Sequence, residues 1–283
     1  MIPPEFDYTV PETLDEALAA LRDGGEDAKV LAGGHSLLPL MKLRLAAPTL
    51  LVDLRKVPGL RGAQRENGTW RIGAMTRHAD LQANADLGVV AEVAALIADQ
   101  QVRNRGTIGG SIAHGDPASD LPTVLVATEG TVTITAQGGT REVPASEMFQ
   151  DYLTTAVGEG EILTEIRLPA LDGWGHGYEK FNRRSEDWAM VGVLALVKRA
   201  ADGSCEDVRI GLTHMGSTPL RATAVEQALR GQGLDAQGIA NAAEQAAEGT
   251  DPPGDLNATP DYKRHLARVL TRRALEQAAG VGS

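Results

Sequence analysis

Residues 32–39 read AGGHSLLP and directly follow the short apolar run Ala28–Leu31, which predicts a strand. Paired glycines let the backbone bend without a Cβ clash, so neighbouring N–H groups can point into one concavity. A second segment, TIGGSIAH at residues 107–114, again places two glycines between hydroxyl side chains. Two such concavities suit a ligand with two phosphates, and ordinary structural turns are the alternative interpretation.

Residues 115–122, which read GDPASDLP, continue from the second segment. Ser119 or Asp120 can cap a helix that carries Pro122 in its first turn. A carboxylate beside a phosphate concavity is unfavourable unless it meets hydroxyl groups, which a ribose or ribityl chain supplies. Asp120 is therefore either a ligand contact or a plain helix cap.

Helices and strands alternate around these segments. Thr13-Leu14-Asp15-Glu16 is a capping box that opens an amphipathic helix ending at Gly24. Strands are predicted at residues 28–31, 50–54, 131–135, 161–168, 190–197 and 208–213. Helices are predicted over residues 87–97, from Thr218-Pro219, near Asp235 and from Thr259-Pro260. The pattern indicates an α+β fold.

The last predicted helix is amphipathic. Leu266, Val269 and Leu270 share its apolar side. Its polar side carries the basic residues Lys263, Arg264, Arg268, Arg272 and Arg273. We interpret it as a solvated surface helix, with a partner-binding role as the less favoured alternative.

The charge of the chain is uneven along its length. Residues 1–175 carry 14 basic and 24 acidic side chains, whereas residues 176–283 carry 13 and 14. The change coincides with residues 169–177, PALDGWGHG, which are rich in turn formers. We therefore predict two domains, at residues 1–175 and 176–283.

Composition excludes several classes of protein. The 283-residue chain has a formal net charge of −11 and only 4% aromatic residues, which argues against nucleic-acid binding. Its single cysteine, Cys205, excludes an internal disulfide and a cysteine-rich zinc or iron–sulfur site built from this chain alone. No apolar run approaches the roughly 20 residues of a membrane span, and residues 1–6 do not resemble a secretory signal. We expect a cytoplasmic protein that is not integral to a membrane.

Competing motifs are absent or out of place. The sequence has no P-loop, and its one G-x-G-x-x-A match, at residues 231–236, follows a predicted helix instead of a strand. No Gly-x-Ser-x-Gly elbow is present. The six histidines show no metal-ligand spacing, so neither a metal site nor a catalytic side chain is predicted.

Together with residues 178–184, residues 187–192 and the helix containing Tyr262, the glycine segments resemble the FAD-binding medium subunit of molybdenum hydroxylases. This is the family of the carbon monoxide dehydrogenase medium subunit, related to the xanthine dehydrogenase flavin domain. The resemblance covers essentially the whole chain. It implies a two-part FAD-binding domain of the PCMH type, followed by a smaller α+β domain with an antiparallel sheet and helices.

The resemblance also implies the residues that bind FAD. The two glycine segments would clasp its pyrophosphate, and Asp120 would bond the ribityl hydroxyls. Leu163 would lie near the flavin or the adenine, and Lys180 near the isoalloxazine. Ser111 stands where the family usually has Asn, which keeps a donor but shortens its reach. The full predicted set is Ala32, Gly33, Gly34, His35, Ser36, Leu37, Thr107, Ile108, Gly109, Gly110, Ser111, Asp116, Asp120, Leu163 and Lys180.

The function implied is that of an electron-exit subunit. FAD on this chain would take electrons from [2Fe–2S] clusters on a small partner subunit and pass them to a quinone, NAD or oxygen. A large molybdopterin subunit would oxidise the substrate, which this chain does not identify, and the assembly would be a dimer of heterotrimers. The alternatives are a stand-alone flavin-dependent oxidase or reductase and a flavin-free assembly subunit.

Overall fold

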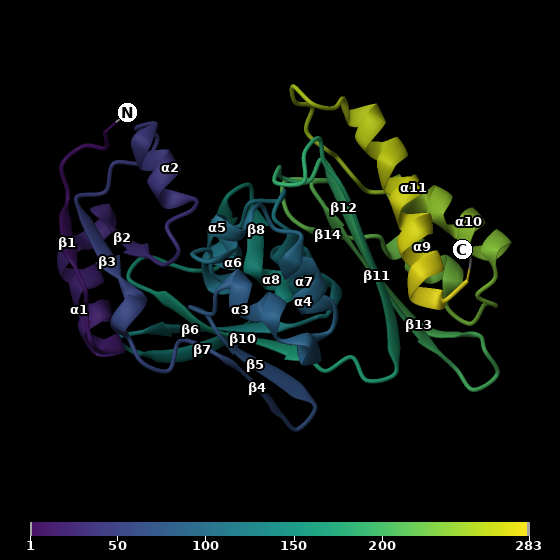
Figure 1. The fold of residues 1–283 in the computed structure, drawn as a ribbon, viewed down its shortest axis with the longest axis horizontal. Coiled ribbons are helices and arrows are strands. Elements are labelled where there is room, and N and C mark those ends of the chain that lie inside the picture. Colours follow the sequence, from purple (N-terminus) through teal and green to yellow (C-terminus); the bar gives the residue numbers. More distant parts are fainter. Residues whose placement is uncertain (1, 282–283) are drawn as a thin grey trace.

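The computed structural model describes residues 2–281, and it confirms the predicted α+β fold. Met1, Gly282 and Ser283, at the outer limits of the two predicted domains, lie outside the described residues. Figure 1 shows three units side by side: a small N-terminal unit, a helix-rich middle unit and a C-terminal sheet backed by helices. None of the helices within residues 2–281 combines the length and apolar character needed to cross a bilayer.

The N-terminal unit is a three-stranded parallel sheet in the order β1-β3-β2. Its elements are β1 (Asp7–Thr9), α1 (Leu14–Gly24), η1 (Gly25–Asp27), β2 (Ala28–Leu31), α2 (Leu37–Lys42), β3 (Leu50–Asp53) and η2 (Leu54–Lys56). The Thr13 cap of α1 is confirmed, because Thr13 Oγ1 accepts from Glu16 N at 3.1 Å. The second bond of the predicted capping box differs, because Glu16 Oε2 accepts from Glu12 N at 2.8 Å. Apolar side chains of α1 and of the sheet form a small core that also includes Met75 and Ile162 of the middle unit.

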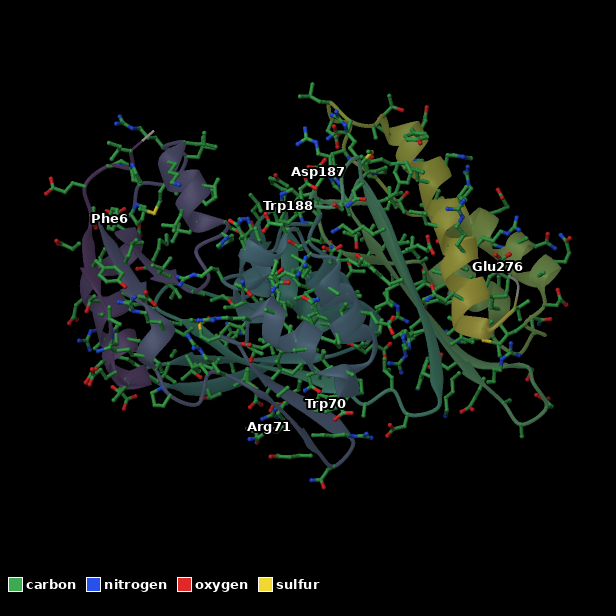
Figure 2. All side chains as sticks on the ribbon, viewed as in Figure 1. Phe6, Trp70, Arg71, Asp187, Trp188 and Glu276 are labelled. Carbon is green, nitrogen blue, oxygen red and sulfur yellow. The ribbon has the colours of Figure 1, made fainter. Side chains whose placement is uncertain are left out.

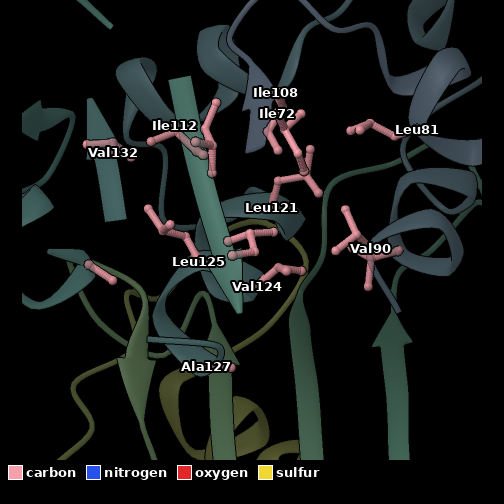
Figure 3. Close-up of a cluster of buried hydrophobic side chains, with 14 of the residues drawn as sticks. Ile72, Leu81, Val90, Ile108, Ile112, Leu121, Val124, Leu125, Ala127 and Val132 are labelled. Atoms are coloured by element: carbon pink, nitrogen blue, oxygen red, sulfur yellow. The ribbon is translucent and has the colours of Figure 1, made fainter. Parts of the chain in front are cut away.

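The middle unit contains a five-stranded antiparallel sheet in the order β4-β5-β10-β6-β7. Its strands are β4 (Ala63–Glu66), β5 (Thr69–Gly73), β6 (Thr131–Ala136), β7 (Gly139–Pro144) and β10 (Ile162–Pro169), beside the short pair β8 (Phe149–Asp151) and β9 (Thr154–Thr155). Its helices are α3 (His78–Ala83), η3 (Ala85–Leu87), α4 (Val89–Ala95), α5 (Gln100–Arg103), α6 (Ile108–His114), α7 (Asp120–Ala127) and α8 (Ala145–Met148). The helices pack on the sheet through the cluster of buried side chains in Figure 3.

The C-terminal unit is a four-stranded antiparallel sheet in the order β11-β12-β13-β14. Its elements are β11 (Trp174–Phe181), β12 (Val191–Arg199), β13 (Cys205–Thr213), β14 (Leu220–Arg221), α9 (Thr223–Leu229), α10 (Ala236–Ala243), η4 (Glu244–Ala247) and α11 (Pro260–Ala279). Helix α11 packs on β11 and β12, and α7 of the middle unit packs on β12 and β13. The sheet therefore has a second core on its outer side and joins the middle core on its inner side.

Several predicted elements differ from the structure. The helix predicted over residues 87–97 is limited to α4, because Gly88, with φ of 55°, separates it from η3. No helix begins at Thr218-Pro219; β14 follows instead, and α9 starts at Thr223. The predicted loop 169–177 is reduced to residues 170–173, since β11 begins at Trp174. The domain limit at residue 175 thus falls inside β11, and the division itself stays a prediction.

The predicted polar side of the last helix is wrong at one position. Lys263 is 0% exposed instead of solvated. Its Nζ donates to Asp255 Oδ2 at 2.7 Å and lies 3.3 Å from His214 Nε2. The loop before α11 folds over this lysine and supplies the carboxylate that compensates its charge, which helical periodicity alone could not indicate.

Candidate cofactor site

A cleft of about 840 Å³ lies between the N-terminal and middle units and reaches the C-terminal sheet at one end. Cofactor pockets typically have volumes of about 300–1,000 Å³. Both glycine segments line it, together with residues 153–155 and 157–161 of the middle unit and residues 186–188 of the loop after β11. Figure 2 shows Asp187 and Trp188 on the upper side of the middle unit, where that loop overhangs it.

The first glycine segment offers free backbone donors. Within residues 2–281, the N–H groups of Gly34, His35 and Ser36 donate to no other backbone group. Gly34 has φ of 77°, a conformation that glycine adopts at little cost. These three residues line the cleft, and their N–H groups have no backbone acceptor within residues 2–281. The N–H groups are therefore suited to bind an anionic oxygen.

The second glycine segment is different, because it forms a helix and not the second backbone concavity that the sequence predicts. Residues 108–114 form the short helix α6, capped by Thr107 Oγ1, which accepts from Gly110 N at 3.1 Å. Ile108 N and Gly109 N donate to carbonyls of residues 76 and 74, and Ser111 N donates to Thr107 O. Its N–H groups are therefore satisfied internally, and the hydroxyls of Thr107 and Ser111 remain as donors toward the cleft.

Close packing explains two of the glycines. A Cβ on Gly33 would meet Arg105 O and would lie 2.8 Å from Gly106 Cα, which are both backbone atoms. A Cβ on Gly109 would lie 2.7 Å from Ala74 O. The absence of side chains at these positions lets the first segment press against residues 105–106 and lets α6 press against the end of β5.

The structure brings most of the predicted site residues together. Those that line the cleft are Ala32, Gly33, Gly34, His35, Ser36, Leu37, Thr107, Gly110, Ser111, Asp120 and Lys180. Four lie behind its wall: Ile108, Gly109 and Leu163 are buried in protein, and Asp116 Oδ1 accepts from Ala118 N at 2.8 Å. Their assignment to the cofactor stays a prediction, and the structure gives each of them a packing or turn-forming contact.

Asp120 occupies the floor of the cleft and is only 4% exposed. Its Oδ2 accepts from Lys180 Nζ at 2.9 Å, and its Oδ1 accepts from Tyr178 Oη at 2.5 Å. Lys180 Nζ also donates to Leu96 O at 3.0 Å. This network compensates the buried carboxylate. The alternative interpretation as a helix cap is wrong, because Asp120 is the first residue of α7 and Ser119 holds the N-cap position without a side-chain cap bond.

Two residues of the cleft wall were not singled out from the sequence. His78 is 5% exposed, and its Nδ1 is enclosed with no hydrogen-bond partner among residues 2–281. Burial, followed by the nearby charges of His35 and Arg103, lowers the pKa of His78 to about 4, so its imidazole is neutral at pH 7. Trp188, in the loop after β11, also lines the cleft and is 55% exposed. An exposed tryptophan at a cleft edge is a platform for a planar group, and its residue type was the available signal.

The electrostatics of the cleft favour recognition by neutral donors. Lys29 and Lys180 are its lysines, and its walls contain no arginine. Its acidic residues are more numerous: Glu26, Asp120, Glu159, Glu161, Glu186 and Asp187. A phosphate would therefore be held by N–H and O–H groups instead of by a surplus of positive charge. No group of three or more potential metal ligands occurs within residues 2–281.

Comparisons with known proteins agree over the whole chain. Residues 4–171 match the family described as the FAD binding domain in molybdopterin dehydrogenase, and residues 176–278 match the CO dehydrogenase flavoprotein C-terminal domain. The carbon monoxide dehydrogenase medium chain of Hydrogenophaga pseudoflava is 44% identical, and the match covers 98% of each chain. The 6-hydroxypseudooxynicotine dehydrogenase complex subunit alpha of Paenarthrobacter nicotinovorans is 39% identical over 98% of this chain and 96% of that protein. The solved Hydrogenophaga pseudoflava carbon monoxide dehydrogenase lacking the Mo-pyranopterin moiety superposes with a TM-score of 0.95, at 44% identity and 99% coverage of both chains.

Proposed function

Because the chain belongs to the family of FAD-binding medium subunits of molybdopterin dehydrogenases, we propose that its cleft holds FAD between the two glycine segments. It is an FAD-carrying oxidoreductase subunit, as the sequence predicted. When bound, FAD supplies the redox chemistry, and the protein binds and orients it. The observation that carries the placement is the cleft itself, whose first segment presents three N–H groups that have no backbone partner within residues 2–281.

The pyrophosphate is assigned to the first glycine segment. Gly34, His35 and Ser36 supply backbone N–H groups, and the Thr107 and Ser111 hydroxyls face them from the other wall. This places the strongest donors on one side of the cofactor only. Ser111, in the position where the family usually has Asn, reaches less far and contributes the weaker contact.

The other end of the cofactor is assigned to the C-terminal sheet. Asp120 accepts hydrogen bonds from the ribityl hydroxyls, and Lys180 lies at the isoalloxazine end, as the resemblance implies. Trp188 is added to the proposal, because its half-exposed ring also lines the cleft. No general base, nucleophile or metal site is assigned, so the oxidation of an organic substrate or of carbon monoxide belongs to another subunit.

The electron route follows from the family. The relatives are named medium chains or subunits of complexes, which supports partnership with a small iron–sulfur subunit and a large molybdopterin subunit. FAD would accept electrons from [2Fe–2S] clusters on the small subunit and pass them to a quinone, NAD or oxygen. We also propose that the assembly is a dimer of heterotrimers located in the cytoplasm.

Cofactor analysis of the native protein tests this function. The chain is purified from its source with its partners, cofactors are released with acid, and flavin, iron and molybdenum are counted per chain. One FAD with iron and molybdenum is expected. FAD without metals would favour a stand-alone flavoenzyme, and intact protein without flavin would favour the assembly subunit; either result contradicts the proposal. Native mass and cell fractionation test the dimer of heterotrimers and its location.

A further inference from the structure

Asp120 is held from one strand by two donors. Tyr178 and Lys180 are two residues apart on β11, so their side chains project from the same face. The Tyr178 hydroxyl donates to Oδ1 at 2.5 Å and the Lys180 ammonium donates to Oδ2 at 2.9 Å. One donor on each oxygen fixes the rotation of the carboxylate, which a single donor would leave free.

The two donors differ in their access to the cleft. Lys180 and Asp120 line it, whereas Tyr178 does not. The Tyr178 hydroxyl is enclosed by Gly192 and Thr213. A Cβ built on Gly192 would lie 3.0 Å from Tyr178 Oη and 2.9 Å from Thr213 Oγ1. Burial, and then the negative charge of Asp120, raises the pKa of Tyr178 well above its usual value, so the hydroxyl remains a donor at neutral pH.

A carboxylate has about four acceptor positions, of which Tyr178 and Lys180 take two. The others are available to hydroxyl groups in the cleft. We propose that Tyr178 is a positioning residue, whose hydroxyl orients Asp120 so that its unused lone pairs face the hydroxyl-bearing chain of FAD. This inference rests on the proposed function, and Tyr178 itself touches no part of the cofactor.

The chain contains a matched control for this bond. Tyr8 Oη donates to Asp53 Oδ2 at 2.7 Å, and Asp53 is also buried. Neither Tyr8 nor Asp53 lines the cleft. Removing the Tyr8 hydroxyl therefore breaks the same kind of tyrosine–aspartate bond at a place where no cofactor contact is proposed.

The test compares FAD with ADP, which carries the pyrophosphate but lacks the ribityl chain and the flavin. Full-length apoprotein is titrated with each ligand for the wild type, Tyr178→Phe and Tyr8→Phe. Tyr178→Phe should weaken FAD binding about tenfold, corresponding to about 1.4 kcal/mol, and leave ADP binding within about twofold. Tyr8→Phe should change neither affinity. An unchanged FAD affinity, or an equal loss for both ligands, in Tyr178→Phe would overturn the inference.

A double-variant cycle tests whether Tyr178 acts through Asp120. If it does, Tyr178→Phe should have no further effect on the ratio of FAD to ADP affinity in an Asp120→Asn background. A further loss there would assign Tyr178 a separate role and contradict the proposal. In the Asp120→Asn background the Lys180 ammonium, whose side chain is 5% exposed, keeps an amide oxygen as acceptor but loses its carboxylate partner. Circular dichroism therefore first establishes that each variant is folded before its affinities are compared. Failure of the wild type to bind FAD would instead overturn the proposed function.

Discussion

At the scale of single residues, Gly33 is a glycine because of what lies opposite it and not because a phosphate must fit there. Gly33→Ala would force a Cβ against Arg105 O and Gly106 Cα. We expect a loss of about 1–3 kcal/mol in the free energy of unfolding, the usual cost of overpacking, and a lower FAD content. Gly138→Ala is the control, since a Cβ there meets nothing within 4 Å. Urea unfolding of the two variants checks the prediction, and equal stability of both would contradict it.

Ser111 provides a prediction about the cofactor. It lines the cleft, but its backbone N–H is already bonded to Thr107 O, so its hydroxyl is the only donor it can offer there. Ser111→Asn, which restores the usual residue of the family, should lengthen the reach of that donor and tighten FAD binding by about threefold to tenfold, the range of one net hydrogen bond. Equilibrium titration of the apoprotein measures this. Unchanged or weaker binding would remove Ser111 from the assigned site.

His78 predicts a pH dependence of stability. The pKa of His78 is about 4 in the folded chain and 6.5 in an unperturbed histidine. Between these pH values the unfolded chain therefore binds a proton on His78 that the folded chain does not bind. The stability due to this group is complete above pH 6.5 and is lost as the pH falls toward 4, by at most about 3 kcal/mol. His78→Gln should flatten this part of the curve. Unfolding free energies of both proteins at pH 7.5, 6 and 5 test it, and parallel curves would contradict it.

Two buried residues that sequence reasoning missed, His78 and Tyr178, share one property. His78 packs against Gly106, and a Cβ at that position would lie 2.8 Å from His78 Nε2. The burial of His78 therefore depends on the glycine at residue 106. The role of Tyr178 depends on Asp120, 58 positions earlier in the chain. Neither dependence leaves a local pattern, whereas the glycine pairs and the hydroxyls beside them do. The sequence therefore indicated the two walls of the cleft but not the side chains enclosed behind them.

At the scale of elements, capping chemistry was the most dependable signal. Thr13, Asp235 and Thr259 each cap the helix predicted to begin beside them. Helix α9 was misplaced because its N-cap, Ala222, makes no side-chain bond that could mark the start. The hairpin β4–β5 was missed although Asn67-Gly68, with φ of 49° and 76°, is a typical two-residue turn. The residues of its two strands are exposed or half-buried except for Ile72, so the strands lack the alternation of buried and polar residues.

Helix α11 provides the prediction at this scale. Lys263 is fully buried, whereas the Asp255 side chain is 32% exposed. Burial by itself raises the pKa of Asp255, but hydrogen bonds from Lys263 and from two backbone N–H groups hold this pKa at about 2. Asp255→Ala should therefore cost about 3–5 kcal/mol, because it leaves a buried ammonium uncompensated, and Lys263→Met should cost clearly less. Thermal unfolding ranks the variants, and the reverse order would contradict this account.

At the scale of the whole molecule, the C-terminal sheet has no free inner face. Tyr178, Leu194 and Leu196 belong to the same buried cluster as the helices of the middle unit. Helix α7 lies against β12 and β13, and α11 covers the other side of the sheet. Figure 1 shows the sheet standing between these two groups of helices. The charge change and the turn formers near residue 173 predicted a connection there, but not that both sides of it share one core.

This shared core predicts that the two parts of the chain depend on each other for folding. Cutting the chain in the loop 170–173 breaks no strand, yet residues 173–283 alone would expose the apolar inner face of β11 and β12 to water. We expect that fragment to aggregate when expressed alone and to become soluble when residues 1–172 are expressed with it. The intact chain should unfold in one transition, with circular dichroism and the fluorescence of Trp70, Trp174 and Trp188 changing together. A folded, monomeric 173–283 fragment, or two separate transitions, would show instead that the charge boundary is also a boundary of folding.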